Sequence, residues 1–235
     1  MRSIHTRFVG LAIAVLAFAA PARGLELVSD DRSVHSVYQN DITDPIVDQT
    51  FVPPVPFGAF DPGLGQHSSS IELTPDGLGF DGTAQGASSQ YYNFPSFGRV
   101  DSVFAIEFRL DRVGSIELEG TLSGGAGGLS NLTLLRDGDV VYDQEVGPYI
   151  YDPSGSGCEF QPPFTRCSVS ISFFGALEPG LYTLEASPEA GTPGAYPSFD
   201  FSFHVLQEVP EPATAMSLAI GLAWISARRR GRARH

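Results

Sequence analysis

Apolar and polar residues alternate with a period of two along several segments in the second half of the chain. Residues 101–110 read DSVFAIEFRL, in which every second side chain from Phe104 to Leu110 is apolar. The same alternation marks residues 115–121, 168–174 and 199–205. A period of two is typical of strands that bury one face and expose the other. These segments therefore predict strands packed on one side against a common core.

Turn signals separate these predicted strands. Asp137-Gly138 stands between the apolar runs LTLL and VVYD, which predicts a two-residue hairpin turn of the primed type. Pro179-Gly180 leads into another strand, and Tyr182 soon after this turn is similar in position to the tyrosine corner of Greek-key sandwiches. Helical periodicity is confined to the two terminal segments. The sequence predicts an all-β fold, an antiparallel β-sandwich of jelly-roll or immunoglobulin-like type, with its best-defined core at 98–206.

The stretch from residue 25 to residue 97 is rich in Pro and Gly, and its strand signals are weaker. Residues 33–38, 69–73 and 89–94 are the segments that resemble strands. About 70 residues so rich in turns would bury too little surface to fold alone. We expect them to supply edge strands and long loops to the same body, residues 23–208. The Gly-rich run at 123–128 is expected to be a flexible loop.

Both ends of the chain carry apolar segments flanked by arginine. Arg2 and Arg7 precede the apolar run 8–20, and Ala20-Pro21-Ala22 is an A-x-A cleavage signal, so residues 1–22 are predicted to be a secretory signal peptide with its signal helix. The uncharged segment 213–227 holds 15 residues. As a transmembrane helix it would span about 22 Å, less than the roughly 30 Å of a bilayer hydrocarbon core.

Arginines follow this segment directly and would stay on the cytoplasmic side of a membrane, so the body would lie outside. They are Arg228, Arg229, Arg230, Arg232 and Arg234. Upstream, Pro210, Glu211 and Pro212 exclude regular helix and sheet and leave an extended strip that a protease could grip. A single-span tail anchor with a Pro-rich stalk is the alternative for this end.

Residues 209–235, with Pro-Glu-Pro, a short apolar helix and an arginine cluster in that order, resemble the C-terminal signal of bacterial PEP-CTERM proteins. The resemblance implies a sorting signal that a membrane protease of the exosortase class recognises and removes, in bacteria that make extracellular polysaccharide. It implies that the chain is exported by the secretion machinery, held transiently at the membrane and delivered to the cell surface or beyond. The body is also similar, more generally, to sandwich modules that precede such tails, through FFGALEPGLYTLEA and its neighbours.

The charge of the chain limits what the body can bind. The formal net charge is −13, and residues 25–208 alone carry 26 acidic residues and 6 arginines, a net charge of −20. Such a body repels nucleic acid, so we expect no DNA or RNA partner. All 14 basic residues are arginine, which excludes mechanisms that need a P-loop or Schiff-base lysine.

The two cysteines, Cys158 and Cys167, lie nine positions apart. In an exported protein an oxidising compartment favours a disulfide between them, and closing that loop would stabilise the fold by about 2.5–3 kcal/mol. No CxxC motif or neighbouring histidine points to a redox or nucleophilic thiol. We therefore expect a structural disulfide.

Few residues of the body stand in sequence patterns that indicate a catalytic or metal-binding site. His35, His67 and His204 share no metal-binding spacing, and no serine stands in a GxSxG motif. Glu117 and Glu119 share one face of a strand, about 7 Å apart, and are expected to be a solvated face rather than a catalytic pair. We expect no enzyme activity and no cofactor, with one open alternative. Calcium could bind the hard oxygen ligands of the acidic loops, at Asp137, Asp139, Asp143 and Asp152.

Aromatic residues offer one further hypothesis. Tyr91, Tyr92, Phe94 and Phe97, and Tyr149 with Tyr151 in a Pro/Gly-rich loop, could stack on sugar rings if they are exposed. Two functions follow for the body. It is a structural or adhesive component of the cell surface or matrix, or a carbohydrate-binding module that associates with extracellular polysaccharide.

Overall fold

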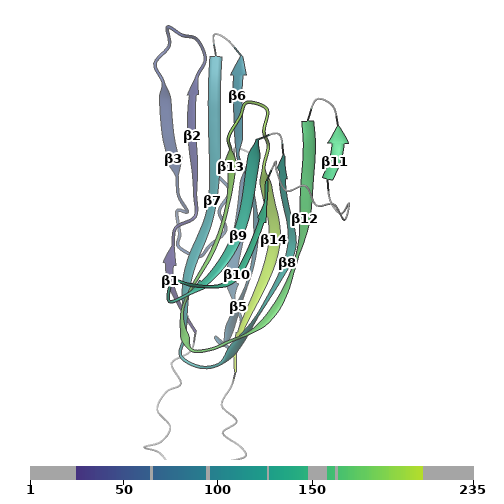
Figure 1. Ribbon diagram of the computed structural model, residues 1–235. Helices are drawn as coiled ribbons and strands as arrows, with labels where there is room; N and C mark the ends of the chain where they lie inside the picture. The colour runs from purple at the N-terminus through teal and green to yellow at the C-terminus, as the bar shows by residue number, and fades with distance from the viewer. Residues whose placement is uncertain are drawn as a thin grey trace, which may run out of the picture.

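The computed structural model describes residues 25–63, 66–93, 96–125, 127–147, 158–161 and 164–208. These residues form strands joined by turns and loops, all paired antiparallel (Figure 1). The strands are β1 (Glu26–Asp30), β2 (Ser33–Gln39), β3 (Val47–Phe51), β4 (His67–Leu73), β5 (Gly79–Ala87), β6 (Ser89–Asn93), β7 (Ser96–Leu110), β8 (Gly114–Gly125), β9 (Gly128–Arg136), β10 (Asp139–Val146), β11 (Cys158–Gln161), β12 (Phe164–Leu177), β13 (Gly180–Ala190) and β14 (Ser198–Gln207). The all-β, antiparallel prediction is confirmed.

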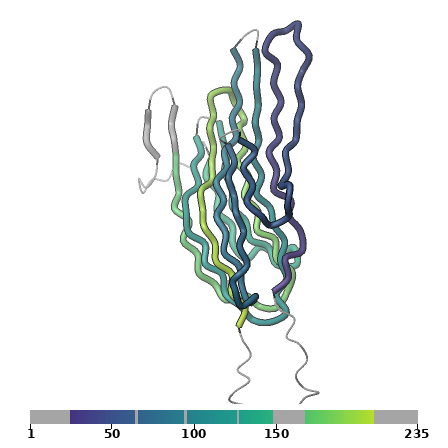
Figure 2. Tube along the Cα trace, turned by 180° about the vertical axis from the view of Figure 1, so that it is seen from behind, coloured from purple at the N-terminus to yellow at the C-terminus, as the bar shows by residue number. Residues whose placement is uncertain are grey.

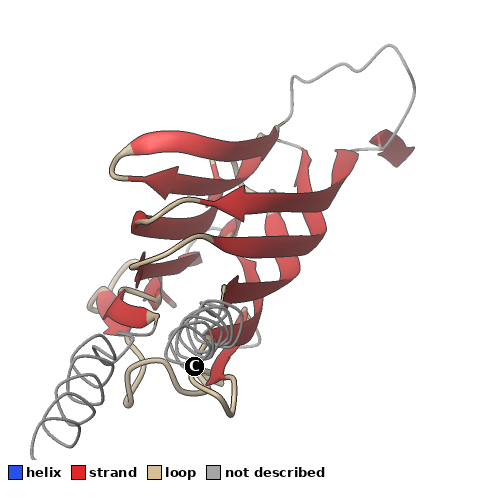
Figure 3. Ribbon diagram, turned by 90° about the horizontal axis from the view of Figure 1, so that it is seen from below, coloured by secondary structure: helices blue, strands red, loops and turns tan. Residues whose placement is uncertain are grey.

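The strands form one curled sheet whose two parts face each other. In one part, β1, β7, β13, β9 and β10 lie side by side, and in the other β12, β8, β14, β5 and β4 do. The view from below shows how the strands curl around the body (Figure 3). Aromatic rings meet between the two parts, since the ring of Phe104 on β7 lies 5.4 Å from that of Phe201 on β14.

The core consists of the apolar positions that the alternation pattern selects. On β7, Phe104, Ile106 and Phe108 are fully buried, and Phe199 to Val205 on β14 are buried at every second position. Each such buried side chain stabilises the fold by about 1.5–3 kcal/mol relative to an exposed one. Most of these core residues lie within 98–206, and β5 and β4 add Phe80, Ala84 and Ile71 from outside that range.

The first half of β7 carries an extension of the body. Phe97 to Val103 pair with β2 on one side, Ser96 to Val100 pair with β6 on the other, and β3 pairs with the outer edge of β2. The tube view shows the β2–β3 hairpin projecting together with β6 and the start of β7 beyond the other strands (Figure 2). Residues 33–38, 69–73 and 89–93 are strands of the same sheet, as expected, while β1, β3 and β5 are strands that the sequence pattern did not predict.

The two ends of the described chain lie at the opposite end of the body from this hairpin (Figure 1). Glu26 pairs with Arg109 near the end of β7, and the backbone N–H of Glu208 donates to Val113 O in the turn between β7 and β8. The predicted signal peptide and the sorting segment 209–235, with both expected helices, lie outside the described residues. Within the described part, no helix is long and apolar enough to cross a membrane.

Two predicted turns have the expected geometry. Asp137 and Gly138 connect β9 to β10 with φ of 50° and 91°, the left-handed values of a primed turn. The hydroxyl of Tyr182 donates to Glu178 O at 2.7 Å, four residues upstream, which is the hydrogen bond of a tyrosine corner. The Gly-rich run 123–128, by contrast, is not a loop: β8 extends to Gly125 and β9 begins at Gly128.

The close packing around these glycines explains the difference. A Cβ on Gly124 would lie 2.6 Å from Val146 O, and one on Gly128 would lie 2.7 Å from Cδ of Pro197. Real Cβ atoms do not approach other heavy atoms so closely, so the backbone positions require glycine. The run is a tight hairpin pressed against β10 and the loop before β14, and its composition reflects packing.

Candidate functional site

The outward side chains of β12, β8, β14, β5 and β4 form a surface that we call the polar face. Antiparallel pairing aligns them in rows across five strands. The central row is Ser172, Glu119, Ser202, Thr83 and Ser70, and its two neighbours are Phe174, Glu117, His204, Asp81, Glu72 and Ser170, Thr121, Asp200, Gln85, Ser68. Adjacent strands lie about 4.8 Å apart, so hydroxyl and carboxylate groups repeat at short, regular intervals.

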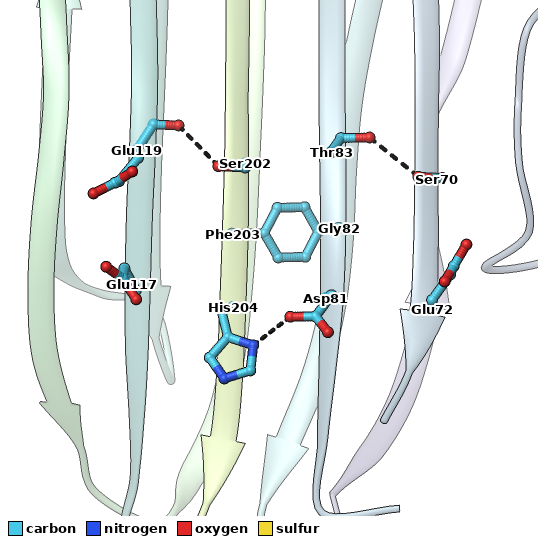
Figure 4. A pocket seen from close by; sticks show the side chains of 10 residues that line it. All are labelled: Ser70, Glu72, Asp81, Gly82, Thr83, Glu117, Glu119, Ser202, Phe203 and His204. Atoms are coloured by element: carbon cyan, nitrogen blue, oxygen red, sulfur yellow. Dashed lines mark hydrogen bonds and ion pairs between the residues drawn. The ribbon is translucent and has the colours of Figure 1, made fainter. Parts of the chain in front are cut away.

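The polar face is hollowed in two places. One open hollow of about 480 Å³ lies over the middle of β8, β14, β5 and β4 (Figure 4). The second hollow, of about 500 Å³, lies beside the first over the same four strands. Its lining includes Gln85, Thr121 and Asp200. Lys and Arg are absent from the residues that line either hollow. Both hollows are therefore acidic and rich in hydroxyl groups.

Hydrogen bonds fix several side chains of the first hollow. The hydroxyls of Ser70 and Thr83 lie 3.1 Å apart, and His204 Nδ1 is bonded to Asp81 Oδ1 (Figure 4). Four carboxylates surround this one histidine: Glu72, Asp81, Glu117 and Glu119. The expectation that Glu117 and Glu119 share an exposed face is confirmed, and His204 lies on the polar side of β14 as expected.

The inward side of β14 explains why β5 is rich in glycine here. The ring of Phe203 lies against Gly82, where a Cβ would collide with it (Figure 4). In the same way the ring of Phe199 covers Gly86. Aromatic rings thus fill the space that β5 leaves empty, and the two strands approach closely under the hollows.

A buried polar network, which no sequence motif indicates, lies beside the second hollow. Arg32 and Asp30 have side-chain exposures of 0% and 3% and are joined by two hydrogen bonds of 2.7 Å. Asp30 Oδ2 also accepts from the backbone N–H of Phe57 at 2.5 Å, and Phe57 has a left-handed φ of 58°. Burial raises the pKa of Asp30, but the hydrogen bonds from Arg32 and Phe57 outweigh it and leave the pKa below its ordinary value.

His67 continues this network. Its Nδ1 lies 2.7 Å from Ser102 Oγ and its Nε2 lies 2.9 Å from Ser69 Oγ, which also accepts from Arg32 at 3.0 Å. Burial, reinforced by the positive charge of Arg32, lowers the pKa of His67 from 6.5 to about 4, against the opposing effect of Asp61 and Asp30. His67 is therefore neutral at physiological pH and acts in packing and hydrogen bonding.

The candidate calcium ligands are not brought together where the structure describes them. Asp137 Oδ1 accepts from the backbone N–H of Leu181, and Asp143 accepts from Thr133 Oγ1 at 3.1 Å. Asp152 lies outside the described residues. In the described ranges no group of three His, Cys, Asp or Glu side chains is placed to hold a metal ion.

Some of the other predicted site residues lie within the described part of the chain and some lie outside it. The register places Cys158 on β11 opposite Cys167 on β12, and the disulfide between them stays a prediction. Tyr149, Tyr151 and Phe94 lie outside the described residues, as do Pro210, Glu211, Pro212 and the five C-terminal arginines. Tyr91, Tyr92 and Phe97 line a separate hollow on the extension.

Comparison with known proteins gives distant structural likenesses. No family model matches the chain, and no curated protein matches it. The adhesin domain of Epf from Streptococcus pyogenes is 14% identical with a TM-score of 0.26, and the match covers 77% of this chain and 65%, just under two thirds, of that domain. The carbohydrate-binding module TmCBM61, solved with β-1,4-galactotriose, is 12% identical with a TM-score of 0.23, covering 64% and 92%. At such TM-scores neither likeness decides fold or function.

Proposed function

We propose that the chain is an exported, non-enzymatic surface protein that adheres to neutral polysaccharide through its polar face. The observation that carries this proposal is the row pattern of Ser, Thr, Asp, Glu and Gln across β12, β8, β14, β5 and β4. Sugar hydroxyls donate to carboxylates and exchange hydrogen bonds with Ser and Thr hydroxyls. Rows of such groups that cross five neighbouring strands suit a long, hydroxylated polymer that lies along or across the strands.

The charge of the face narrows the ligand class. Glu72, Asp81, Glu117, Glu119 and Asp200 all project from it, and His204 is already bonded to Asp81. Polyanions such as uronate polymers would be repelled, whereas a neutral glycan meets acceptors for its hydroxyls. The ligand that suits this charge is a neutral polysaccharide.

The fold class and the chain ends support the same role. We assign the curled sheet to the sandwich class, of Greek-key type, on the strength of the two facing parts and the tyrosine corner of Tyr182. Because Leu25 and Glu208 lie at one end of the body, a C-terminal membrane segment would tether that end and leave the polar face free (Figure 1). Open, shallow hollows on a sheet surface suit adhesion better than catalysis.

Two hydroxyl deletions test the polar face. The double variant Thr83→Val/Ser202→Ala is expected to weaken binding to the extracellular polysaccharide of the host at least tenfold, because it removes two hydroxyls from the centre of the central row. Both side chains are exposed, so the fold should persist. The measurement is affinity electrophoresis of the purified full chain in gels that contain the polysaccharide, with calcium and then with chelator.

The matched control is Thr133→Val on β9, in the part of the sheet opposite the polar face, which should bind like the wild type. Equal retardation of all three proteins would refute the polar face as the binding surface. If the wild type itself is not retarded in either condition, the protein is a structural component without a glycan ligand. Loss of retardation in chelator alone would revive calcium as a cofactor.

Sorting is tested separately. We infer from the resemblance to PEP-CTERM proteins that Pro210, Glu211 and Pro212 form the recognition strip for an exosortase-type protease. Replacing all three with Ala is expected to abolish C-terminal processing and cause the uncleaved chain to accumulate in the membrane fraction. Mass spectrometry of the C-terminus reads this out. A control that replaces Val209 with Ala should be processed normally, and processing of the triple variant would disprove the assignment.

A further inference from the structure

The extension of the body carries an aromatic hollow that the polar face does not explain. It has a volume of about 660 Å³ and lies over β2, β7 and β6. Cross-strand register aligns His35 with Asp101, Val37 with Arg99, and Tyr92 with Phe97. Since β7 runs from this hollow to Leu110 beside the chain ends, the hollow lies at the far end of the body from Leu25 and Glu208.

Apolar groups form the floor of this hollow. Tyr92 is 66% exposed on β6, an edge strand of the extension, and Phe97 and Val37 are half-buried beside it. An exposed tyrosine next to a second aromatic ring is unusual for a surface that meets only water, and such groups are enriched where proteins bind ligands. Tyr91 does not add to the exposed ring surface in the same way, because its ring folds onto Gly98.

Polar groups surround the aromatic floor. Arg99 Nε donates to Asp101 Oδ2 at 2.7 Å, which fixes both side chains, and His35 is bonded to Asp48 at 2.8 Å. Asp101 Oδ1 is buried and has no hydrogen-bond partner within the described residues. A buried acceptor without a partner costs free energy. An apolar floor with a few fixed polar groups is the usual composition of a small-ligand site.

We propose that this hollow is a stacking site for one pyranose ring of a neutral glycan. The apolar face of the sugar would lie on Tyr92 and Phe97, and its hydroxyls would meet Arg99, Asp101 and Gln90. Nucleobases also stack on tyrosine, but the net charge of −20 on residues 25–208 repels nucleic acids and acidic sugars. The inference extends the proposed adhesion to glycans by a second subsite, built from different residues on a different part of the sheet.

Oligosaccharide titration tests the proposal. The purified full chain is titrated calorimetrically with the β-1,4-linked hexaoses of glucose, mannose and galactose, and with hexagalacturonate as the anionic comparison. At least one neutral hexaose is expected to bind, and hexagalacturonate is not. Tyr92→Ala should weaken that binding at least tenfold, while Tyr92→Phe, which keeps the ring, should stay within about threefold of the wild type.

Tyr196→Ala is the matched control, because Tyr196 is 64% exposed but does not line the hollow. Absence of binding by every neutral hexaose, or equal affinities of Tyr92→Ala and Tyr196→Ala, overturns the proposal. A change from dimer to monomer in Tyr92→Ala, measured by sedimentation, would also overturn it, since the hollow would then be a contact between two copies of the chain.

The same titrations separate the two glycan surfaces. If Thr83→Val/Ser202→Ala weakens binding and Tyr92→Ala does not, the polar face stands and the aromatic subsite fails. The reverse result leaves the aromatic subsite as the binding site and removes the polar face. Additive losses of affinity in the combined variant Thr83→Val/Ser202→Ala/Tyr92→Ala would assign both surfaces to one ligand, as expected for well-separated contacts.

Discussion

Replacing Asp30 with Ala is expected to lower the free energy of unfolding by about 3–5 kcal/mol, because it leaves the buried guanidinium of Arg32 without its counter-ion. Arg32 is completely buried, and two of its hydrogen bonds go to Asp30. The substitution also removes the acceptor that holds the backbone of Phe57 in its left-handed conformation. Urea denaturation of the full chain at pH 7 measures the loss.

Two further variants identify the cause. Asp30→Leu/Arg32→Met removes both charges and should cost less than Asp30→Ala alone, since no unpaired charge remains. Glu178→Ala breaks an exposed ion pair with Arg136, which solvent screens, and should cost much less than Asp30→Ala. If Asp30→Ala and Glu178→Ala are equally stable, the buried pair does not stabilise the fold as described.

The second large effect is a pH dependence that originates in His67. Its pKa is about 4 in the folded chain and 6.5 when unfolded. Both states hold a neutral ring above pH 6.5, so the stability there is complete. Between pH 6.5 and 4 the unfolded chain takes up a proton that the folded chain does not, and the free energy of unfolding falls by about 3 kcal/mol. Below pH 4 this contribution changes no further.

The variant His67→Gln isolates this contribution, because glutamine can keep hydrogen bonds to Ser69 and Ser102 but does not titrate. We expect the stability difference between wild type and His67→Gln to shift by about 3 kcal/mol in favour of the variant as the pH falls from 7.5 to 4. Parallel curves for the wild type and His67→Gln would contradict the buried, neutral state of His67.

The strands that alternate cleanly were predictable, and those rich in glycine were not. The pattern around Phe104, Ile116, Ile171 and Phe201 predicts β7, β8, β12 and β14 because each strand buries one face. β5 reads GFDGTAQGA, where the inward positions Gly82 and Gly86 hold glycine and alternate with the core residues Phe80 and Ala84. The aromatic rings of β14 fill the space beside these glycines. The sequence of β5 alone therefore does not show that the strand has a buried face.

The candidate site was predictable only in fragments. Alternation places Glu117 and Glu119 on an outer face, but the row from Glu119 through Ser202 to Thr83 joins residues far apart in the sequence. Such pairings follow from the topology of the whole sheet. The sequence did contain a signal for His67. It lies four residues before Ile71, a core residue, and side chains an even number of positions apart on a strand point to the same side.

The position of β14 also determines how the body carries load. Every residue from Ser198 to Leu206 pairs with β5 on one side and β8 on the other, and the strand ends at the edge of the body where the chain continues toward residue 209. Tension between a C-terminal anchor and a glycan held elsewhere on the body would pull β14 along its own axis. All of its backbone hydrogen bonds would then resist sliding together instead of opening one after another. With the anchor and the glycan contact proposed above, such shear loading would give the protein mechanical strength where flowing water drags on the bound polymer.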